Sequence, residues 1–197
     1  YSFSLVAQGG YLAFLGRIAP EKGVDRAIQI ARLVGLPLRI AAKVDNANRD
    51  YFETRIEPLL SEPGVEFLGE IGEDAKSEFL GGACALLFPI SWPEPFGLVM
   101  IEAMACGTPV IAFDQGAVSE VIQDGKTGFV VQTVDEAVEA ISRLETIDRV
   151  VVRATFERRF SVDTMAAKYE AAYATVFANR EAAADIEVPV NGFAHTV

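Results

Sequence analysis

The chain has 197 residues, of which 51% are hydrophobic and 23% are charged, and its formal net charge is −11. This length and apolar content are enough for one domain with a substantial core. No apolar run is long enough to span a membrane, and the sequence does not start with the pattern of a signal peptide. The acidic balance, without a basic stripe, argues against nucleic acid as a partner.

Short apolar runs alternate with helical patterns along most of the chain. Strands are predicted for residues 11–15, 38–42, 65–68, 83–88, 110–113 and 129–131. Helices are predicted for residues 24–34, 51–60, 73–80, 98–106, 117–122 and 134–144. This alternation predicts an α/β fold, a Rossmann-like parallel sheet with helices on both faces. In such sheets ligands bind at the carboxyl ends of the strands.

The last part of the chain is predicted to be helical as far as residue 179. Ser161 suits the N-cap of a helix that ends near Phe177. We interpret the arginines between residues 149 and 159 as a solvated helix face. The predicted domain covers residues 1–180, and residues 181–197 are predicted to form a flexible tail. The tail contains the single histidine, His195, which we do not expect to be a catalytic base.

Two cysteines, Cys84 and Cys106, have apolar neighbours in the sequence. We expect both to be buried free thiols, which fits a reducing cytoplasm. No spacing typical of a metal site is present.

The stretch from Pro89 to Pro109 has the clearest chemical pattern. Its first part is predicted to be a loop, because three prolines prevent a regular helix. A helix is predicted to begin after Gly97, where unpaired backbone N–H groups and the positive end of the helix dipole favour an anion. Glu94 lies in the loop and Glu102 about one turn into the helix. This layout suits a ligand that carries phosphates and hydroxyls.

Each of these charged positions also has an ordinary structural interpretation. A single glutamate in a helix is usually solvated, but Glu102 has apolar residues on both sides. Arg17 and Lys22 lie on the turn after the first predicted strand and could bind phosphate, Arg through its planar fork and Lys as a compact charge. The alternative is a surface ion pair, such as Lys22 with Glu21.

The central stretch resembles a known family. Glu94 and Glu102 are separated by seven residues, and they lie in Glu-Pro-Phe-Gly-Leu and Glu-Ala-Met-Ala-Cys-Gly-Thr-Pro-Val-Ile-Ala. This pattern is similar to the signature of the retaining GT-B glycosyltransferases of family 4. The turn Gly-Arg-x-x-x-Glu-Lys-Gly, which begins at Gly16, also resembles that family. The resemblance covers residues 11–177 and implies the donor-binding, C-terminal half of a GT-B fold.

The resemblance also implies roles for individual residues. Arg17 and Lys22 would bind the donor diphosphate, Glu102 the ribose hydroxyls, and Glu94 the donor sugar. The backbone N–H groups of Phe96, Gly97 and Leu98 would face the sugar and the distal phosphate. The candidate binding residues, with the turn glycine included, are Gly16, Arg17, Lys22, Glu94, Phe96, Gly97, Leu98 and Glu102. Glu94, Arg17 and Lys22 are the candidate catalytic residues.

The donor implied by the resemblance is a UDP-sugar or GDP-sugar, with no metal and no cofactor. Lys43 and the edge at Leu68-Gly69 are candidates for the nucleobase wall. Many relatives carry a glycine-rich turn where this chain has Ala-Ala-Lys-Val-Asp, so the base is left open. The later segments resemble a bacterial branch of the family, and the acceptor does not follow from the sequence.

A GT-B enzyme has two Rossmann-like domains, and the acceptor-binding N-terminal half is missing from this sequence. We therefore expect the chain to bind a sugar nucleotide but to be an incomplete, inactive half of a hexosyltransferase by itself. Any peripheral membrane association would come through the missing domain. The alternatives are a non-catalytic nucleotide-sugar-binding or regulatory module, and a fragment of a GT-B nucleotide-sugar epimerase. A generic dinucleotide-binding domain is less favoured, because no Gly-x-Gly-x-x-Gly follows a predicted strand.

Overall fold

The computed structural model describes residues 1–184 and contains a six-stranded sheet with the strand order β3-β2-β1-β4-β5-β6. All neighbouring strands in this sheet are parallel. The strands are β1 Leu12–Arg17, β2 Leu38–Lys43, β3 Val65–Gly69, β4 Ala85–Phe88, β5 Val110–Phe113 and β6 Gly128–Val131. The predicted α/β, Rossmann-like fold class is thereby confirmed.

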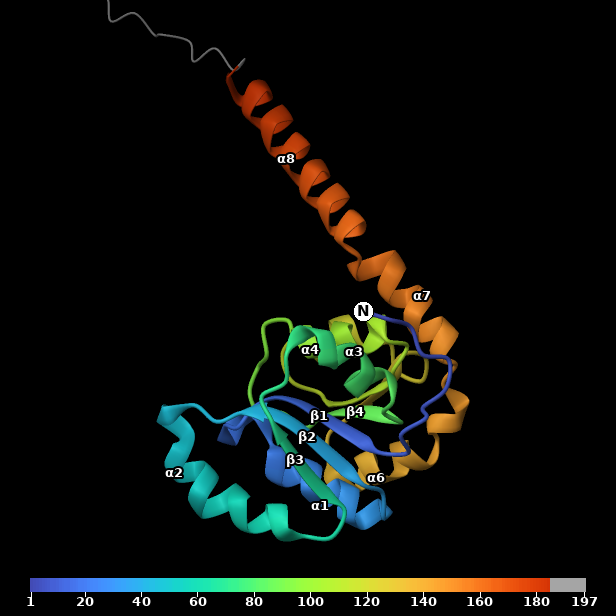
Figure 1. The fold of residues 1–197 in the computed structure, drawn as a ribbon. Coiled ribbons are helices and arrows are strands. Elements are labelled where there is room, and N and C mark those ends of the chain that lie inside the picture. The colour runs from blue at the N-terminus through green and yellow to red at the C-terminus, as the bar shows by residue number, and fades with distance from the viewer. Residues whose placement is uncertain (185–197) are drawn as a thin grey trace, which may run out of the picture. The chain divides into compact units, whose positions relative to one another are not determined.

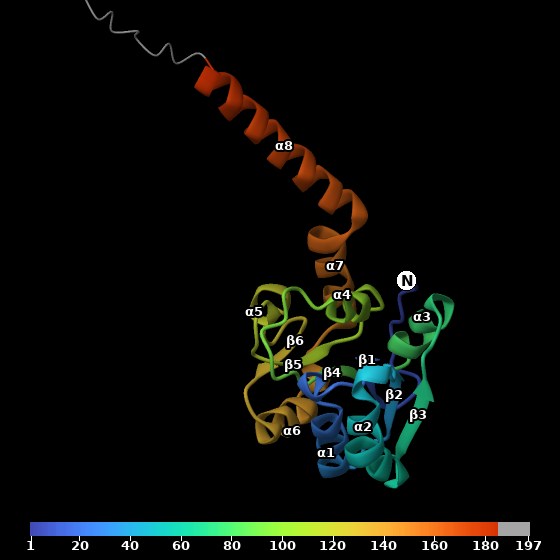
Figure 2. The ribbon, with the colours of Figure 1, turned by 90° about the vertical axis from the view of Figure 1, so that its left-hand side faces the viewer.

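Helices connect the strands and cover both faces of the sheet (Figures 1 and 2). The α-helices are α1 Val24–Val34, α2 Arg49–Tyr51, α3 Glu73–Gly81, α4 Leu98–Ala105, α5 Val118–Val121, α6 Val134–Ser142, α7 Arg149–Phe160 and α8 Val162–Ala184. Helices α1 and α6 pack against each other on one face, while α3 and α4 lie on the other. The strand order reverses between β1 and β4, in the middle of the sheet. In this fold class, ligands bind at the carboxyl ends of the strands beside such a reversal.

The central strands read as continuous apolar runs because both of their faces are covered. All four residues of β4 and all four of β5 are buried. The edge strand β3 instead alternates between half-buried and exposed residues. The core therefore runs through the middle of the sheet, beneath the loops that follow β1, β4 and β5.

The predicted helix over residues 51–60 is helical but not a regular α-helix. It begins earlier, as α2 at Arg49, and continues as a π-helical turn over Phe52–Ile56 and a 3-10 turn over Glu57–Ser61. Pro58 has no N–H to donate to the preceding turn, so the i→i−4 ladder cannot pass through it.

The interpretation of the arginines between residues 149 and 159 as a solvated helix face is wrong for Arg149. Its guanidinium is partly buried and donates to the carbonyls of Ser4 (2.9 Å), Ala83 (2.9 Å) and Gly81 (2.8 Å), and to Thr108 Oγ1 (2.8 Å). Burial lowers the pKa of Arg149 from its ordinary value. This side chain ties the N-terminal segment to the α3–β4 and α4–β5 turns.

The chain divides into one compact unit over Tyr1–Arg158 and a second that begins at Arg159. In the second unit, the Thr164 N–H donates to Ser161 Oγ (3.2 Å), so Ser161 is the predicted N-cap. Helix α8 extends past Phe177 to Ala184 and therefore includes residues 181–184 of the predicted tail. Residues 185–197, with His195, lie outside the described residues. Among residues 1–184, none of the helices has the length and apolar character needed to cross a bilayer.

Candidate functional site

Loops that follow separate strands are tied together at the carboxyl edge of the sheet. The Ser91 N–H, in the loop after β4, donates to the Glu21 carbonyl in the turn after β1 (2.9 Å). The Ala117 N–H, after β5, donates to the Glu94 carbonyl (2.9 Å). The central loop is therefore held from both sides by backbone hydrogen bonds, and the backbone of Glu94 is fixed.

A cavity of about 340 Å³, here called the Glu94 cavity, opens at this edge. Six of the predicted site residues line it together: Gly16, Lys22, Glu94, Phe96, Gly97 and Leu98. Apolar residues from β1, β4 and the start of α4 complete the wall. Small-molecule pockets are usually concave and mostly apolar, with a few polar groups, and this cavity has that composition.

The charged groups of the Glu94 cavity form one cluster. Lys22 Nζ donates to Glu94 Oε2 in an ion pair, and the two side chains are only 17% and 14% exposed. Trp92 Nε1 donates to the same oxygen (3.0 Å), and Lys22 Nζ lies 5.1 Å from the centre of the Trp92 ring. The two donors fix the carboxylate, and the lysine supplies a positive charge to the cavity.

The amino end of α4 lines the same cavity. Gly97 is the N-cap residue and has φ +76°, a left-handed conformation that disfavours other residues. A Cβ at Gly97 would lie 2.6 Å from Met100 Cε, so the turn is also tightly packed. The unpaired N–H groups of the first helical turn favour an anion here.

A second cavity of about 210 Å³, the Glu102 cavity, adjoins the first and shares Leu15, Gly16 and Val99 with it. Its charged lining comes from the end of β2, from the loop and helix α3 after β3, and from α4: Lys43, Glu70, Glu73, Lys76 and Glu102. An elongated ligand that reaches from Glu94 to Glu102 would pass over Gly16, which has no side chain to block it.

Glu102 is partly buried, with its side chain 17% exposed, and is not a freely solvated residue. Its Oε1 accepts hydrogen bonds from the Tyr1 hydroxyl (2.6 Å) and from Lys76 Nζ (3.2 Å). Burial, together with the hydrogen bond to Glu102, raises the pKa of Tyr1. The phenol therefore stays protonated and remains a donor to Glu102.

Not all of the predicted positions line these two cavities. Arg17 lines neither cavity, because its side chain is 47% exposed and pairs with Glu21 (2.8 Å). The expected surface pair of this turn therefore involves Arg17, whereas Lys22 pairs with Glu94. Lys43 lines the Glu102 cavity, whereas Leu68 lines a different groove.

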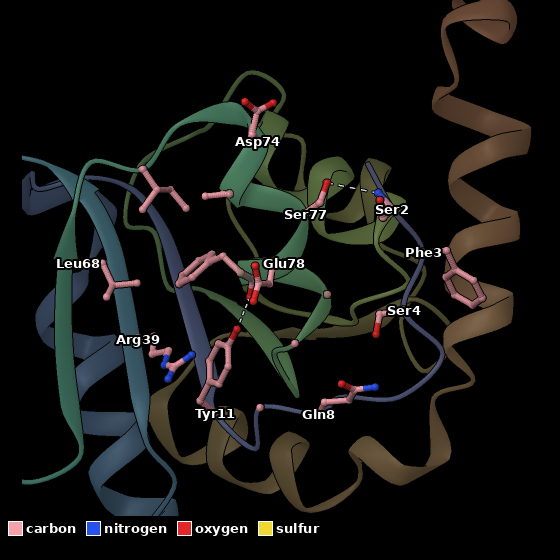
Figure 3. A pocket seen from close by; sticks show the side chains of 16 residues that line it. Ser2, Phe3, Ser4, Gln8, Tyr11, Arg39, Leu68, Asp74, Ser77 and Glu78 are labelled. Atoms are coloured by element: carbon pink, nitrogen blue, oxygen red, sulfur yellow. Dashed lines mark hydrogen bonds between the residues drawn. The ribbon is translucent and has the colours of Figure 1, made fainter.

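That groove, the N-terminal groove, has a volume of about 680 Å³ and lies between the N-terminal segment, α3 and the strands β2 and β3 (Figure 3). Arg39 stacks on the ring of Tyr11 (4.4 Å), whose hydroxyl donates to the Phe79 carbonyl (2.6 Å). None of the eight candidate binding residues lines it, although Leu68, a candidate for the nucleobase wall, does.

The predicted free cysteines do not line any of these three cavities. Cys106 is buried as expected, whereas Cys84 is only half-buried, and both thiols are free. Burial raises the pKa of Cys106 to about 11, so this thiol stays protonated at neutral pH.

Sequence reasoning missed Trp92, Tyr1, Glu73 and Lys76. Trp92 is the single tryptophan and stands two residues before Glu94, which could have indicated its contact. Lys76 lies within the helix predicted over residues 73–80. Nothing in its spacing relates it to Glu102, 26 residues further along the chain.

Comparison with known proteins identifies the family of this chain. The family model described as "Glycosyl transferases group 1" matches residues 5–158. A D-inositol 3-phosphate glycosyltransferase from Rhodococcus erythropolis is 35% identical over 131 residues, which cover 61% of this chain and 29% of the relative. An alpha-maltose-1-phosphate synthase from Mycolicibacterium smegmatis is 34% identical over 133 residues, covering 61% and 32% of the two chains.

The fold recurs in a crystal structure of Anabaena Alr3699/HepE in complex with UDP and glucose. The TM-score is 0.74 and the identity 22%, and the match covers 85% of this chain and 49% of that one. The chain spans about a third of the length of the two curated relatives above. Because the family model matches most of the sequence, the chain belongs to the group 1 glycosyl transferase family.

Proposed function

We propose that the chain is the donor-binding, C-terminal half of a retaining GT-B glycosyltransferase of family 4. It binds a nucleoside diphosphate hexose across the two adjoining cavities at the carboxyl edge of the sheet. The observation that most supports this proposal is that Glu94 and Lys22 form an ion pair in one cavity while Glu102 lines the adjoining cavity. A carboxylate suits sugar or ribose hydroxyls, and a lysine suits phosphate.

In this proposal, each cavity takes one part of the donor. The hexose lies against Glu94, the diphosphate lies near Lys22 and the amino end of α4, and the ribose lies against Glu102. As the bond from sugar to phosphate breaks, negative charge develops on the leaving diphosphate, and these fixed positive groups stabilise it. Arg17 would join them by exchanging its surface pair with Glu21 for a phosphate oxygen.

Transfer itself needs an acceptor, and we assign the acceptor site to an N-terminal domain that this sequence does not contain. The share of the relatives that the chain covers supports this division. The proposed donor is a UDP-hexose or a GDP-hexose, used without a metal in the cytoplasm. UDP is the first probe, because the Anabaena structure of the same fold holds UDP and glucose.

The proposal is tested by calorimetric titration of the chain with UDP, GDP, ADP and their glucose conjugates, without added metal. We expect saturable binding of one nucleotide. Glu102→Ala should weaken it about tenfold or more, since a hydrogen bond to a charged group is worth about 1.5–3 kcal/mol. Glu139→Ala removes an exposed carboxylate from α6 and serves as the control. No saturable binding of any nucleotide would reject the proposal.

A second prediction concerns Trp92. The change Trp92→Phe keeps an aromatic ring beside Lys22 but removes the N–H that donates to Glu94 Oε2. We expect the affinity for the glucose conjugate to fall about tenfold, because the carboxylate loses one of its two fixing donors. The affinity for the nucleotide without sugar should change less than about twofold. A parallel loss for both ligands would contradict a role for Trp92 through Glu94.

A further inference from the structure

Lys76 is placed where it can control Glu102. It lies in α3, its side chain is 18% exposed, and its Nζ bridges Glu73 Oε1 (2.6 Å) and Glu102 Oε1 (3.2 Å). Glu73 itself is on the outside, with its side chain 75% exposed. The lysine is therefore held between an outer carboxylate that solvent screens and an inner carboxylate that lines the cavity.

Lys76 stays positively charged in this position. Burial disfavours its charged form, but hydrogen bonds and charge interactions with Glu73 and Glu102 outweigh burial and raise the pKa of Lys76. The pKa of Glu73 is lowered, chiefly by its hydrogen bond to Lys76. Lys76 and Glu73 are thus both charged at neutral pH.

The carboxylate that Lys76 holds already accepts a hydroxyl. The N-terminal segment is attached to α3 by the Ser2 N–H, which donates to Ser77 Oγ (3.3 Å), as Figure 3 shows. The neighbouring Tyr1 places its hydroxyl 2.6 Å from Glu102 Oε1. Both hydrogen-bond donors to Glu102, Lys76 and Tyr1, contact Oε1, which leaves Oε2 without a partner among residues 1–184.

We propose that Lys76 is a positioning residue that makes the Glu102 cavity selective for ribonucleotides over deoxyribonucleotides. This inference rests on the proposed function and adds to it the residue that sets hydroxyl recognition. Lys76 anchors one oxygen of Glu102, so the other oxygen keeps a fixed direction toward the ribose hydroxyls. On binding, a ribose hydroxyl replaces the phenol of Tyr1 while the lysine stays in place.

Lys76 also limits the negative charge of the cavity. The Glu102 cavity is lined by two lysines and three glutamates, so loss of Lys76 leaves Lys43 alone against three carboxylates. A diphosphate would then be repelled whether or not its sugar carries the 2′-hydroxyl. This general effect should cancel when the affinities for a ribonucleotide and its 2′-deoxy analogue are compared as a ratio.

The test is calorimetric titration with UDP, GDP or ADP, whichever the native chain binds best, and with its 2′-deoxy analogue. The native chain should prefer the ribonucleotide about tenfold, as expected for a hydroxyl that donates to a carboxylate. In Lys76→Met this preference should fall to about twofold or less. Lys76→Arg, which can still donate to Glu102, should restore it. Lys126→Met removes an exposed lysine from a distant turn and should leave the preference unchanged.

A double variant tests whether Lys76 affects the preference for ribonucleotides through Glu102. In the background of Glu102→Ala the preference should be gone, and adding Lys76→Met should change it no further. If Lys76→Met weakens both nucleotides equally and keeps the preference, or if the native chain has no preference, the inference is wrong. If the native chain binds none of the nucleotides, the proposed function fails and this inference fails with it. Thermal unfolding of each variant checks that it is folded.

Discussion

Replacing Arg149 with methionine is expected to destabilise the compact unit more than any other change to an arginine in α7. The guanidinium donates four hydrogen bonds, three of them to backbone carbonyls, and joins segments that are 145, 68 and 66 residues away in sequence. Methionine fills a similar volume but leaves these acceptors without their donor. A buried acceptor left without its donor costs about 1–3 kcal/mol, and four acceptors lose their donor at this partly buried site. We expect a loss of about 3 kcal/mol in the free energy of unfolding.

Urea-induced unfolding, followed by circular dichroism, measures this loss. Arg158→Met is the matched control, because Arg158 is an exposed residue of the same helix and the change removes the same charge. It should change the free energy of unfolding by less than about 0.5 kcal/mol. A similar stability for the two variants would show that the hydrogen bonds of Arg149 contribute little.

Gly116→Ala is expected to damage both stability and donor binding. Gly116 has φ +60°, and a Cβ there would lie 2.4 Å from the carbonyl oxygen of Glu94 and 2.5 Å from its backbone nitrogen. These neighbours are backbone atoms and cannot rotate away, so the loop that carries Glu94 must move. We expect the free energy of unfolding to fall by about 2–4 kcal/mol, from the left-handed conformation and the overlap together. The affinity for the sugar nucleotide should fall below detection in the same calorimetric titration.

The control for this prediction is Gly125→Ala. Gly125 has nearly the same backbone conformation, with φ +68°, but nothing lies within 4 Å of a Cβ built there. Its cost should be only the conformational term, about 1–2 kcal/mol, and donor binding should be unchanged. If the two alanine variants bind the sugar nucleotide equally well, the contact between Gly116 and the Glu94 backbone does not control the site.

The fold class could be predicted because its causes are local. Apolar runs such as Leu86-Leu87 and Val110-Ile111 alternate with helical patterns, and this alternation alone requires a parallel sheet. The Glu94 and Glu102 positions could be found because they lie within one short stretch whose resemblance to a family is specific. That Glu94, Lys22 and Gly97 line one cavity followed from the rule that loops after parallel strands meet at one edge.

The remaining features depend on side-chain contacts between distant segments. Lys76 meets Glu102 across 26 residues and Arg149 meets Ser4 across 145, and neither separation has a periodic pattern. The surface interpretation of the arginines was wrong for Arg149 because arginine can satisfy several carbonyls at once in a partly buried position. Likewise, the sequence does not indicate that Arg17 rather than Lys22 pairs on the surface, since both lie near Glu21.

The way the central loop is tied has a consequence for how the site forms. Glu94 is positioned by Lys22 from the turn after β1, by Trp92 from its own loop, and by Gly116 and Ala117 from the turn after β5. Apart from the local contact of Trp92, these contacts have long sequence separations, so they form late, after the central strands have paired. A partly folded chain then has no affinity for the donor. The ligand acts only on the complete sheet, and saturating donor should slow amide hydrogen exchange throughout β1, β4 and β5, not only in the loops it touches.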